Sequence, residues 1–498
     1  MSAARSPAPR GPRSTASDAP RGEPRGEGPA LPGFNERVRN AIANRQLHIA
    51  LDRTTAQFGS RRLAALATLD DADAVRDRAR AAKMDTLRRL GDALRTFEQR
   101  LVANGARVHW AETAADANRI VVDIAAQAGV RRVVKGKTMV SEETHLNDAL
   151  ARAGVDVVET DLGEYIVQLA NDRPSHIIAP IVHMTREQVG RVMHERLQVP
   201  YSDDTETLAR YARERLREAF LRADMGLTGA NFGVVENGTI CLVTNEGNGR
   251  MVTTLPRVHV VVMGIEKLVP TMADLDVFLK LLARSATGQK LTAYTTLLRG
   301  PRRNGEDGGP DEMHVVLLDN GRASMLAGET AEILGCIRCG ACLNACPVYK
   351  NIGGHAYGDV YTGPVGAIVT PGIRGIEQAA DLPGASSLCG ACREVCPIRL
   401  DIPRMLLALR KTAVQRTRQP IALRVGMKAF ARIASRPSVY RVAMSAVRRL
   451  LRARATNGWI ADAPGLAAGW TRFRDLKAPA ARTFDQLWRA RAASRRPS

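Results

Sequence analysis

The sequence lacks a long apolar run and is poor in aromatic residues. Phe, Trp and Tyr make up 4% of the 498 residues, although hydrophobic residues together reach 45%. No apolar stretch approaches the roughly 18 to 20 residues that cross a bilayer. The first 33 residues are rich in Pro, Gly, Ser and Arg and contain no apolar core of a secretory signal. These absences predict a globular, cytoplasmic protein with a disordered segment at residues 1–33.

Cysteine is nearly absent outside one short stretch. Seven of the eight cysteines lie between residues 336 and 396, and the eighth is Cys241. In a chain without an export signal, this clustering predicts metal ligation in a reducing compartment instead of disulfides. Cys241 lies in an apolar run, so we expect it to be a small buried side chain.

Acidic residues are scarce near the C-terminus. Residues 401–498 hold 22 Lys and Arg but 4 Asp and Glu, a net charge of +18, which leaves about +3 of the total +21 for the rest. Helical spacing over residues 421–455 puts Leu423, Met427 and Phe430 on one stripe. Such a region suits an anionic membrane surface, an acidic partner or an ordinary solvated face. Nucleic acid is disfavoured because aromatic residues do not alternate with the basic ones.

Short apolar runs alternate with helical patterns before the cysteine-rich stretch. Strands are predicted at residues 131–136, 155–160, 175–182 and 258–264. Asn237-Gly238 predicts a type I′ turn in a hairpin at residues 232–243. This alternation indicates an α/β domain with a largely parallel sheet. We found no Gly-rich nucleotide fingerprint between a predicted strand and a helix, and no Walker A motif.

The segment "CIRCGACLNACP" carries a ferredoxin-type cluster motif. Cys336, Cys339, Cys342 and Cys346 follow the x2-x2-x3 spacing, and Pro347 comes next. This spacing is typical of 4Fe-4S proteins with two clusters, in which the fourth cysteine serves the other cluster. Zinc fits this spacing less well, because it needs four ligands in one tetrahedral site.

A second run, "SSLCGACREVCP", repeats the motif without its first cysteine. Swapped ligation assigns to cluster one the thiolates of Cys336, Cys339, Cys342 and Cys396. Cluster two then receives the thiolates of Cys346, Cys389 and Cys392. It is one ligand short, because Ser386 stands where the first cysteine would be. The fourth position could be taken by Ser386, His355, solvent or a partner's group, or the cluster could be of the 3Fe-4S type.

Several longer segments resemble one known family. They are "VVKGKTMVSEE", "LTGANFGVVENGTI", "PRVHVVVMGIEKLVPT" and "HAYGDVYTGPVGAIVTP", together with the two cysteine runs. From about residue 40 onward, the chain resembles the LutB/YkgF family of lactate-utilisation iron–sulfur proteins. The family pattern has seven cysteines, so Ser386 is not a departure from it.

The resemblance implies a domain order and a function. It implies a LUD-type α/β domain at residues 34–328, with a helical N-terminal extension and a fold similar to ribose-phosphate isomerases and CoA transferases. An α-helical ferredoxin-type domain with two clusters would follow at 329–410, and a basic helical region at 411–498. The chain would be the electron-transfer subunit of a dehydrogenase-type complex that oxidises L-lactate to pyruvate. Its partners would be a cysteine-rich subunit and a second LUD-domain protein, with peripheral membrane contact through the basic region as a further expectation.

Two other readings remain open at this point. Glu236 in "VENG" is similar to the nucleophile of CoA transferases, which would make the clusters structural. A redox-sensing scaffold with a labile second cluster is the third reading. Weaker candidate sites are an anion site at Lys135, Lys137 and a helix start near Ser141, and a carboxylate partner at Arg250.

Overall fold

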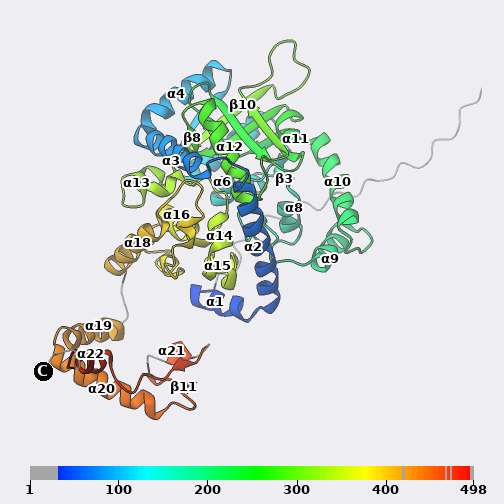
Figure 1. Cartoon of the computed structure of the whole chain (residues 1–498). Helices are drawn as coiled ribbons and strands as arrows, with labels where there is room; N and C mark the ends of the chain where they lie inside the picture. The colour runs from blue at the N-terminus through cyan, green and yellow to red at the C-terminus, as the bar shows by residue number, and fades with distance from the viewer. Residues whose placement is uncertain (1–31, 418–420, 466–467, 472–473, 494–498) are drawn as a thin grey trace, which may run out of the picture. The chain divides into compact units, whose positions relative to one another are not determined.

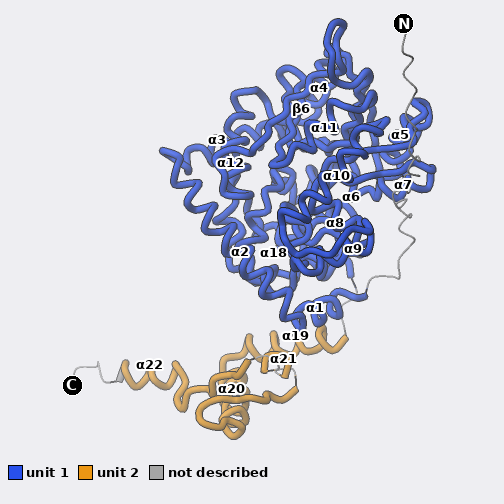
Figure 2. Tube along the Cα trace, turned by 90° about the vertical axis from the view of Figure 1, so that its right-hand side faces the viewer, with its two compact units in different colours: residues 1–417 blue, residues 418–498 orange. Residues whose placement is uncertain are grey.

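The computed structural model describes residues 32–417, 421–465, 468–471 and 474–493. Most of the predicted N-terminal segment, residues 1–31, therefore lies outside the described residues. The chain divides into two compact units, residues 1–417 and 418–498 (Figure 2). Each unit is described by itself below.

A six-stranded, fully parallel sheet forms the centre of the first unit (Figure 1). In spatial order its strands are β1 (Arg107–Ala111), β10 (Glu312–Leu318), β7 (Val258–Gly264), β4 (Met225–Thr228), β2 (Arg132–Lys135) and β3 (Asp156–Glu159). Every residue of β7 is buried. A central strand covered on both faces is mostly apolar, because neither row of side chains meets water, and the buried His259 ring of β7 is hydrogen-bonded to Thr228 Oγ1.

Helices cover both faces of the sheet. One face packs on α4 through Leu94 and Phe97, and the other on α5 through Val121 and Ile124. The N-terminus of α5 is held by a capping box at Thr113. The helices up to the end of the sheet are α1 (Phe34–Ala43), α2 (Arg45–Leu66), α3 (Ala72–Arg88), α4 (Leu90–Ala103), α5 (Ala114–Gln127), α6 (Met139–Glu143), α7 (Leu146–Arg152), α8 (Leu162–Leu169), α9 (Arg186–Leu197), α10 (Thr205–Arg222), α11 (Asn248–Thr254) and α12 (Met272–Ala286). The predicted α/β domain with a parallel sheet is confirmed.

A four-stranded sheet adjoins the first one. Its strands are β8 (Leu268–Val269), β5 (Phe232–Val234), β6 (Thr239–Thr244) and β9 (Tyr294–Leu298). The predicted hairpin pairs β5 with β6, but the predicted type I′ turn is wrong. Residues 235–238 separate the strands, and only Gly238 has a positive φ, +72°. The Gly238 N–H donates to Val234 O, so the turn is a longer loop.

The strand predicted at residues 175–182 is also wrong. The segment forms a loop, in which the His176 ring accepts the N–H groups of Ile178 and Ala179. Pro180 has no N–H to offer a neighbouring strand. The apolar run is buried by packing on other elements, so burial alone does not make it a strand.

The cysteine-rich segment is built of short helices that pack on the N-terminal extension. These elements are α13 (Arg322–Leu326), α14 (Ala341–Ala345), α15 (Pro347–Ile352), α16 (Gly363–Arg374), α17 (Ala391–Glu394) and α18 (Ile402–Arg416), with short 3-10 turns at Ala331–Gly335, His355–Tyr357 and Leu382–Gly384. A further 3-10 turn, Ile265–Lys267, follows β7 in the α/β domain. Helices α14 and α15 lie against α2 (Figure 1), and α16 lies against α18. One hydrophobic cluster unites side chains of α2, α12 and this segment.

A buried ion network joins this segment to the carboxyl edge of the large sheet. Arg322 Nη2 lies 2.8 Å from Glu143 Oε2, and Arg322 Nε lies 2.7 Å from Glu266 Oε2. The hydroxyl of Tyr361 donates a hydrogen bond to the same Glu143 oxygen, Oε2, at 2.7 Å. The side chains of Arg322, Glu143 and Glu266 are at most 4% exposed. These charges are tolerated inside the protein because each one has a partner.

The second unit contains helices with one apolar side. Its elements are α19 (Ile421–Ala434), α20 (Pro437–Ala453), β11 (Trp459–Ile460), α21 (Ala468–Thr471), β12 (Leu476–Lys477) and α22 (Phe484–Ala493). Large exposed apolar side chains on α19 and α20 include Ile421, Phe430 and Val442. None of the helices in the described part of the chain combines the length and apolar character that crossing a bilayer requires.

The Arg322 network predicts a large effect of one substitution. Arg322→Leu leaves two buried carboxylates without their main partner, so we expect it to lower the free energy of unfolding by about 3–5 kcal/mol. Denaturant or thermal unfolding measures the loss. The control is Arg95→Ala, which breaks an ion pair with Asp92 whose side chains are 73% and 74% exposed and should cost less than about 1 kcal/mol. Equal stabilities of the two variants would contradict the importance of the network.

Candidate iron–sulfur site

Two turns of the same backbone shape carry most of the cysteines. In the first, Arg338 and Gly340 flank Cys339 with φ values of +59° and +74°. In the second, Leu388 and Gly390 flank Cys389 with φ values of +56° and +87°. The residues before and after Cys339 and Cys389 have left-handed φ values in both turns, so the second run keeps the loop conformation of the first.

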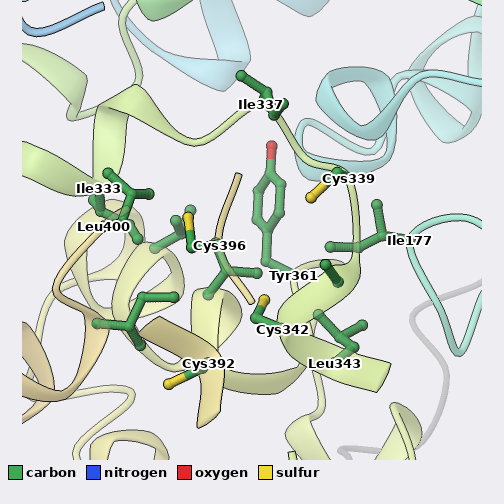
Figure 3. Close-up of a cluster of buried hydrophobic side chains, with 14 of the residues drawn as sticks. Ile177, Ile333, Ile337, Cys339, Cys342, Leu343, Tyr361, Cys392, Cys396 and Leu400 are labelled. Carbon is green, nitrogen blue, oxygen red and sulfur yellow. The ribbon is translucent and has the colours of Figure 1, made fainter. Parts of the chain in front are cut away.

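Four cysteines line one small cavity at the first turn. Its lining includes Cys336, Cys339 and Cys342 together with Cys396, which comes from the end of the second run. Apolar side chains complete the wall, among them Ile177 and Val365. Figure 3 shows Cys339, Cys342 and Cys396 among buried apolar side chains, with the Tyr361 ring in the same cluster. This donor set fits a cubane cluster, since thiolates in an apolar cradle are its normal ligands.

The remaining three cysteines form a second, more open group. Cys346 and Cys392 are buried, whereas Cys389 is exposed. Burial raises the pKa of the Cys392 thiol to about 12, and the negative charges of Cys346 and Cys389 add to this rise. These mutual effects require the three sulfurs to lie near one another.

Burial also acts on the thiols of the first group. It raises the pKa of Cys396 to about 11 and raises those of Cys339 and Cys342 further. A buried thiolate without a counter-charge is costly, so these residues become thiolates when a metal supplies positive charge. Backbone N–H groups already point at two sulfurs: Arg338 N lies 3.4 Å from Cys336 Sγ, and Tyr349 N lies 3.5 Å from Cys346 Sγ.

Ser386 repeats the position of Cys336 in the second turn. Leu388 N donates to Ser386 Oγ at 3.1 Å, just as Arg338 N donates to Cys336 Sγ two residues after that cysteine. The serine oxygen therefore takes the place in the turn that a first-position cysteine sulfur would take. Ser386 remains a predicted ligand of cluster two.

His355, the other protein candidate for that ligand, is held elsewhere. Its Nε2 lies 2.8 Å from Arg173 O and 3.9 Å from Asp172 Oδ1. Its ring also packs edge-on against His183, with centroids 4.5 Å apart. Asp172, His183 and His355 could together bind a metal ion, but their hydrogen bonds already satisfy them as a polar cluster.

The two lysines of the predicted anion site in the α/β domain do not form an open binding site. Lys135 Nζ lies 2.7 Å from Glu142 Oε1 and 2.5 Å from Glu159 Oε1, so its charge is already neutralised. Lys137 Nζ lies 3.5 Å from Glu164 Oε1 and donates to Ile178 O at 3.4 Å, so it also has partners. The predicted anion site is therefore not supported.

The other singled-out residues of that domain have structural roles or lie at the surface. Glu236 is exposed, and its Oε2 accepts the Met272 N–H at the start of α12. Arg250 is exposed. Cys241 lies on β6 and is fully buried, as expected, and burial raises its pKa to about 12.

Sequence reasoning missed the charged residues around the first turn. Arg338 is 8% exposed and lies between Cys336 and Cys339 in the sequence. Its Nη2 lies 3.7 Å from Oε1 of Glu266, a member of the Arg322 network. The sequence held one indication of this difference, because Arg338 and Leu388 occupy the same position in the two cysteine runs.

The fold and the cysteine groups define an iron–sulfur protein of the two-cluster ferredoxin type built onto an α/β domain, and family models agree. Residues 94–318 match the LUD domain, 332–400 match a 4Fe-4S dicluster domain, and 409–493 match the C-terminal region of lactate utilisation protein B. The chain belongs to the lactate utilization protein B family. The resemblance noted from the sequence motifs is thereby confirmed.

Full-length relatives are similar throughout. "Lactate utilization protein B" of Oceanobacillus iheyensis is 40% identical over 460 residues, covering 92% of this chain and 96% of the relative. The protein of the same name from Bacillus subtilis is 40% identical over 465 residues, covering 93% and 97%. "Uncharacterized electron transport protein YkgF" of Escherichia coli is 43% identical over 413 residues, covering 83% and 87%.

The position of Ser386 predicts the behaviour of the second group. We expect Ser386→Ala to lower the iron retained by about one atom per chain, because one corner of cluster two loses its protein ligand. Ser386→Cys should retain all iron and make the cluster more resistant to air. Iron analysis and electron paramagnetic resonance (EPR) of anaerobically purified protein measure both effects.

The matched control is Cys241→Ala, which removes a thiol far from both turns in sequence and should leave the iron content unchanged. Wild-type iron content and spectra in Ser386→Ala would contradict ligation by the serine and leave solvent or a partner's group as the fourth ligand.

Proposed function

We propose that this chain is the iron–sulfur electron-transfer subunit of a system that oxidises L-lactate to pyruvate. The observation that carries the proposal is the cavity that gathers Cys396 with Cys336, Cys339 and Cys342, although Cys396 is 54 positions after Cys342 in the numbering. Membership of the lactate utilization protein B family supplies the substrate part of the proposal.

The cysteines would hold two clusters in a swapped arrangement. Cluster one would be bound by Cys336, Cys339, Cys342 and Cys396, and cluster two by Cys346, Cys389 and Cys392 with Ser386. When bound, such clusters carry single electrons at potentials set by their surroundings. The two-electron oxidation of lactate can thus be divided into single-electron transfers. The apolar residues around the first group exclude water, while the exposed Cys389 brings the second group to the surface.

The protein's own groups prepare the site for this task. The N–H groups of Arg338 and Tyr349 point at cysteine sulfurs and would stabilise their negative charge. The left-handed backbone of the two turns sets the positions of Cys336, Cys339 and Cys342 in the first and of Ser386, Cys389 and Cys392 in the second. Fixed ligands reduce the rearrangement that accompanies each change of charge, which favours electron transfer over chemistry at the cluster.

The two other readings have less support. A CoA-transferase-type enzyme would need Glu236 in a substrate cavity, but this residue is exposed and holds the start of α12. A redox-sensing scaffold remains compatible with the open second group, but the family relationship favours electron transfer. By the same relationship, we propose a cysteine-rich subunit and a second LUD-domain protein as partners in the cytoplasm.

Anaerobic co-purification tests the function. We expect a tagged chain to retain the two partner subunits, and L-lactate to reduce the clusters of the complex as followed by EPR. The matched control is Cys342→Ala, which should weaken or abolish the signal of cluster one. Clusters that stay oxidised with L-lactate, but are reduced by dithionite, would contradict the lactate assignment while leaving electron transfer intact.

We also propose that the second unit binds an anionic membrane surface. Residues 402–461 contain no Asp or Glu, and α20 combines the exposed apolar residues Val442 and Leu450 with exposed Arg441 and Arg449. Apolar side chains can enter the headgroup region while arginines contact anionic lipids.

Vesicle flotation tests this membrane proposal. The chain should float with phosphatidylserine-containing vesicles but not with pure phosphatidylcholine, and less at high salt. The double variant Arg441→Glu, Arg449→Glu should lose this binding, whereas Arg95→Glu in the first unit should keep it. Absence of lipid-dependent flotation in the wild type would contradict the proposal.

A further inference from the structure

The two cysteine turns share a backbone but differ in one charged residue. Arg338 precedes Cys339 in the first turn, and Leu388 precedes Cys389 at the same position of the second. Both have the same sign and nearly the same value of φ. The two turns can therefore be compared directly, because one has a buried cation where the other has an apolar side chain.

Arg338 is buried and its guanidinium is only partly paired. Its Cζ lies 4.8 Å from the centroid of the Tyr361 ring, and its Nη2 lies 3.7 Å from Glu266 Oε1. Its Nη1 is buried and has no hydrogen-bond partner among the described residues, although Arg338 lines the cavity of the first cysteine group. A buried charged donor without an acceptor is costly, and a cluster in the cavity that Arg338 lines would supply the missing acceptor.

The nearby carboxylate does not cancel the charge of Arg338. Glu266 makes its short contact with Arg322 Nε, at 2.7 Å, and only a longer one with Arg338. Arg322 is itself shared with Glu143. Arg338 therefore has only a shared, longer-range ion pair within this buried network.

Other arginines add to the positive surroundings of the first group. Arg62 Nη2 donates to Val395 O at 2.9 Å, and Arg76 Nη2 donates to Cys396 O at 2.9 Å. Near the second turn, Arg410 is half-buried and donates its Nε and Nη2 to the carbonyls of Pro383 and Ser386. Solvent also reaches this second group through the exposed Cys389 and screens charges there.

We propose that Arg338 donates from Nη1 to the cluster of the first group and sets its reduction potential above that of the second cluster. The proposal rests on the proposed function, because it requires both clusters. Adding an electron makes a cluster more negative, so a buried cation and hydrogen-bond donor stabilise the reduced form. An electron shared between the two clusters then resides mainly on cluster one, and the exposed second cluster exchanges electrons with a partner.

A redox titration of the wild-type chain gives the first test. Two EPR signals are expected, and Ser386→Cys should alter only the signal of cluster two, which assigns both signals. The signal that Ser386→Cys leaves unchanged should have the higher potential. The opposite order would overturn the proposal, and this measurement does not depend on the stability of any Arg338 variant.

Substitution of Arg338 gives the second test. Arg338→Leu installs the residue that the second turn already carries in the same conformation. At a fixed potential near the midpoint, it should lower the reduced-to-oxidised ratio of cluster one at least tenfold, about 59 mV for a one-electron couple. Arg338→Lys keeps the charge and should recover most of the shift. The control Arg416→Leu removes an arginine whose side chain is 65% exposed and should change neither potential.

Iron content separates tuning of the potential from loss of the cluster. Arg338→Leu with full iron and an unchanged potential would overturn the proposal. If Arg338→Leu does not shift the potential of cluster one while L-lactate still reduces the clusters of the complex fully, the role of Arg338 is overturned and the proposed function stands. Failure of lactate to reduce a wild-type complex with the predicted order of potentials would contradict the proposed function and not the role of Arg338.

Discussion

The buried carboxylate of Glu266 links the α/β domain to the cysteine-rich segment within the first unit. It follows β7, the fully buried central strand, and pairs with Arg322 and, at longer range, with Arg338 of the first cysteine turn. Its backbone carbonyl also accepts a hydrogen bond from buried Lys83. A charge in this position must be paired, because water cannot reach it. The sheet edge and the cysteine turn therefore hold their positions together.

This constraint explains why two similar turns differ in their surroundings. The first turn lies against the charged edge of the sheet, where Arg338 is buried over the ring of Tyr361. In the second turn the same position is Leu388, and the cysteine that follows it, Cys389, is exposed. The same local sequence pattern thus meets two different electrostatic environments. In proteins with two clusters, such a difference in charge and burial is the main means of separating potentials.

Local sequence patterns predicted the strands that the apolar content of a short segment is enough to identify. The run Val258–Gly264 is buried along its whole length, so apolar content alone identified a central strand. The paired strands at 232–234 and 239–244 were also predicted, but not the four-residue loop between them. The strand expected at residues 175–182 failed because Pro180 and the His176 ring remove the hydrogen bonds that a ladder needs. Apolar content does not reveal where backbone hydrogen bonds go.

The sequence by itself determined the chemistry of the site. Cysteine spacing depends on a few consecutive backbone angles, so residue types and spacing predicted the two matching turns. The assignment of the seven thiols and Ser386 to two clusters stays a prediction. Only the tertiary structure decided what surrounds them. The partners of Arg338 come from residues 266 and 361, and those of Lys135 from 142 and 159. Charge pairing at such separations depends on the packing of the sheet edge, which no local pattern encodes.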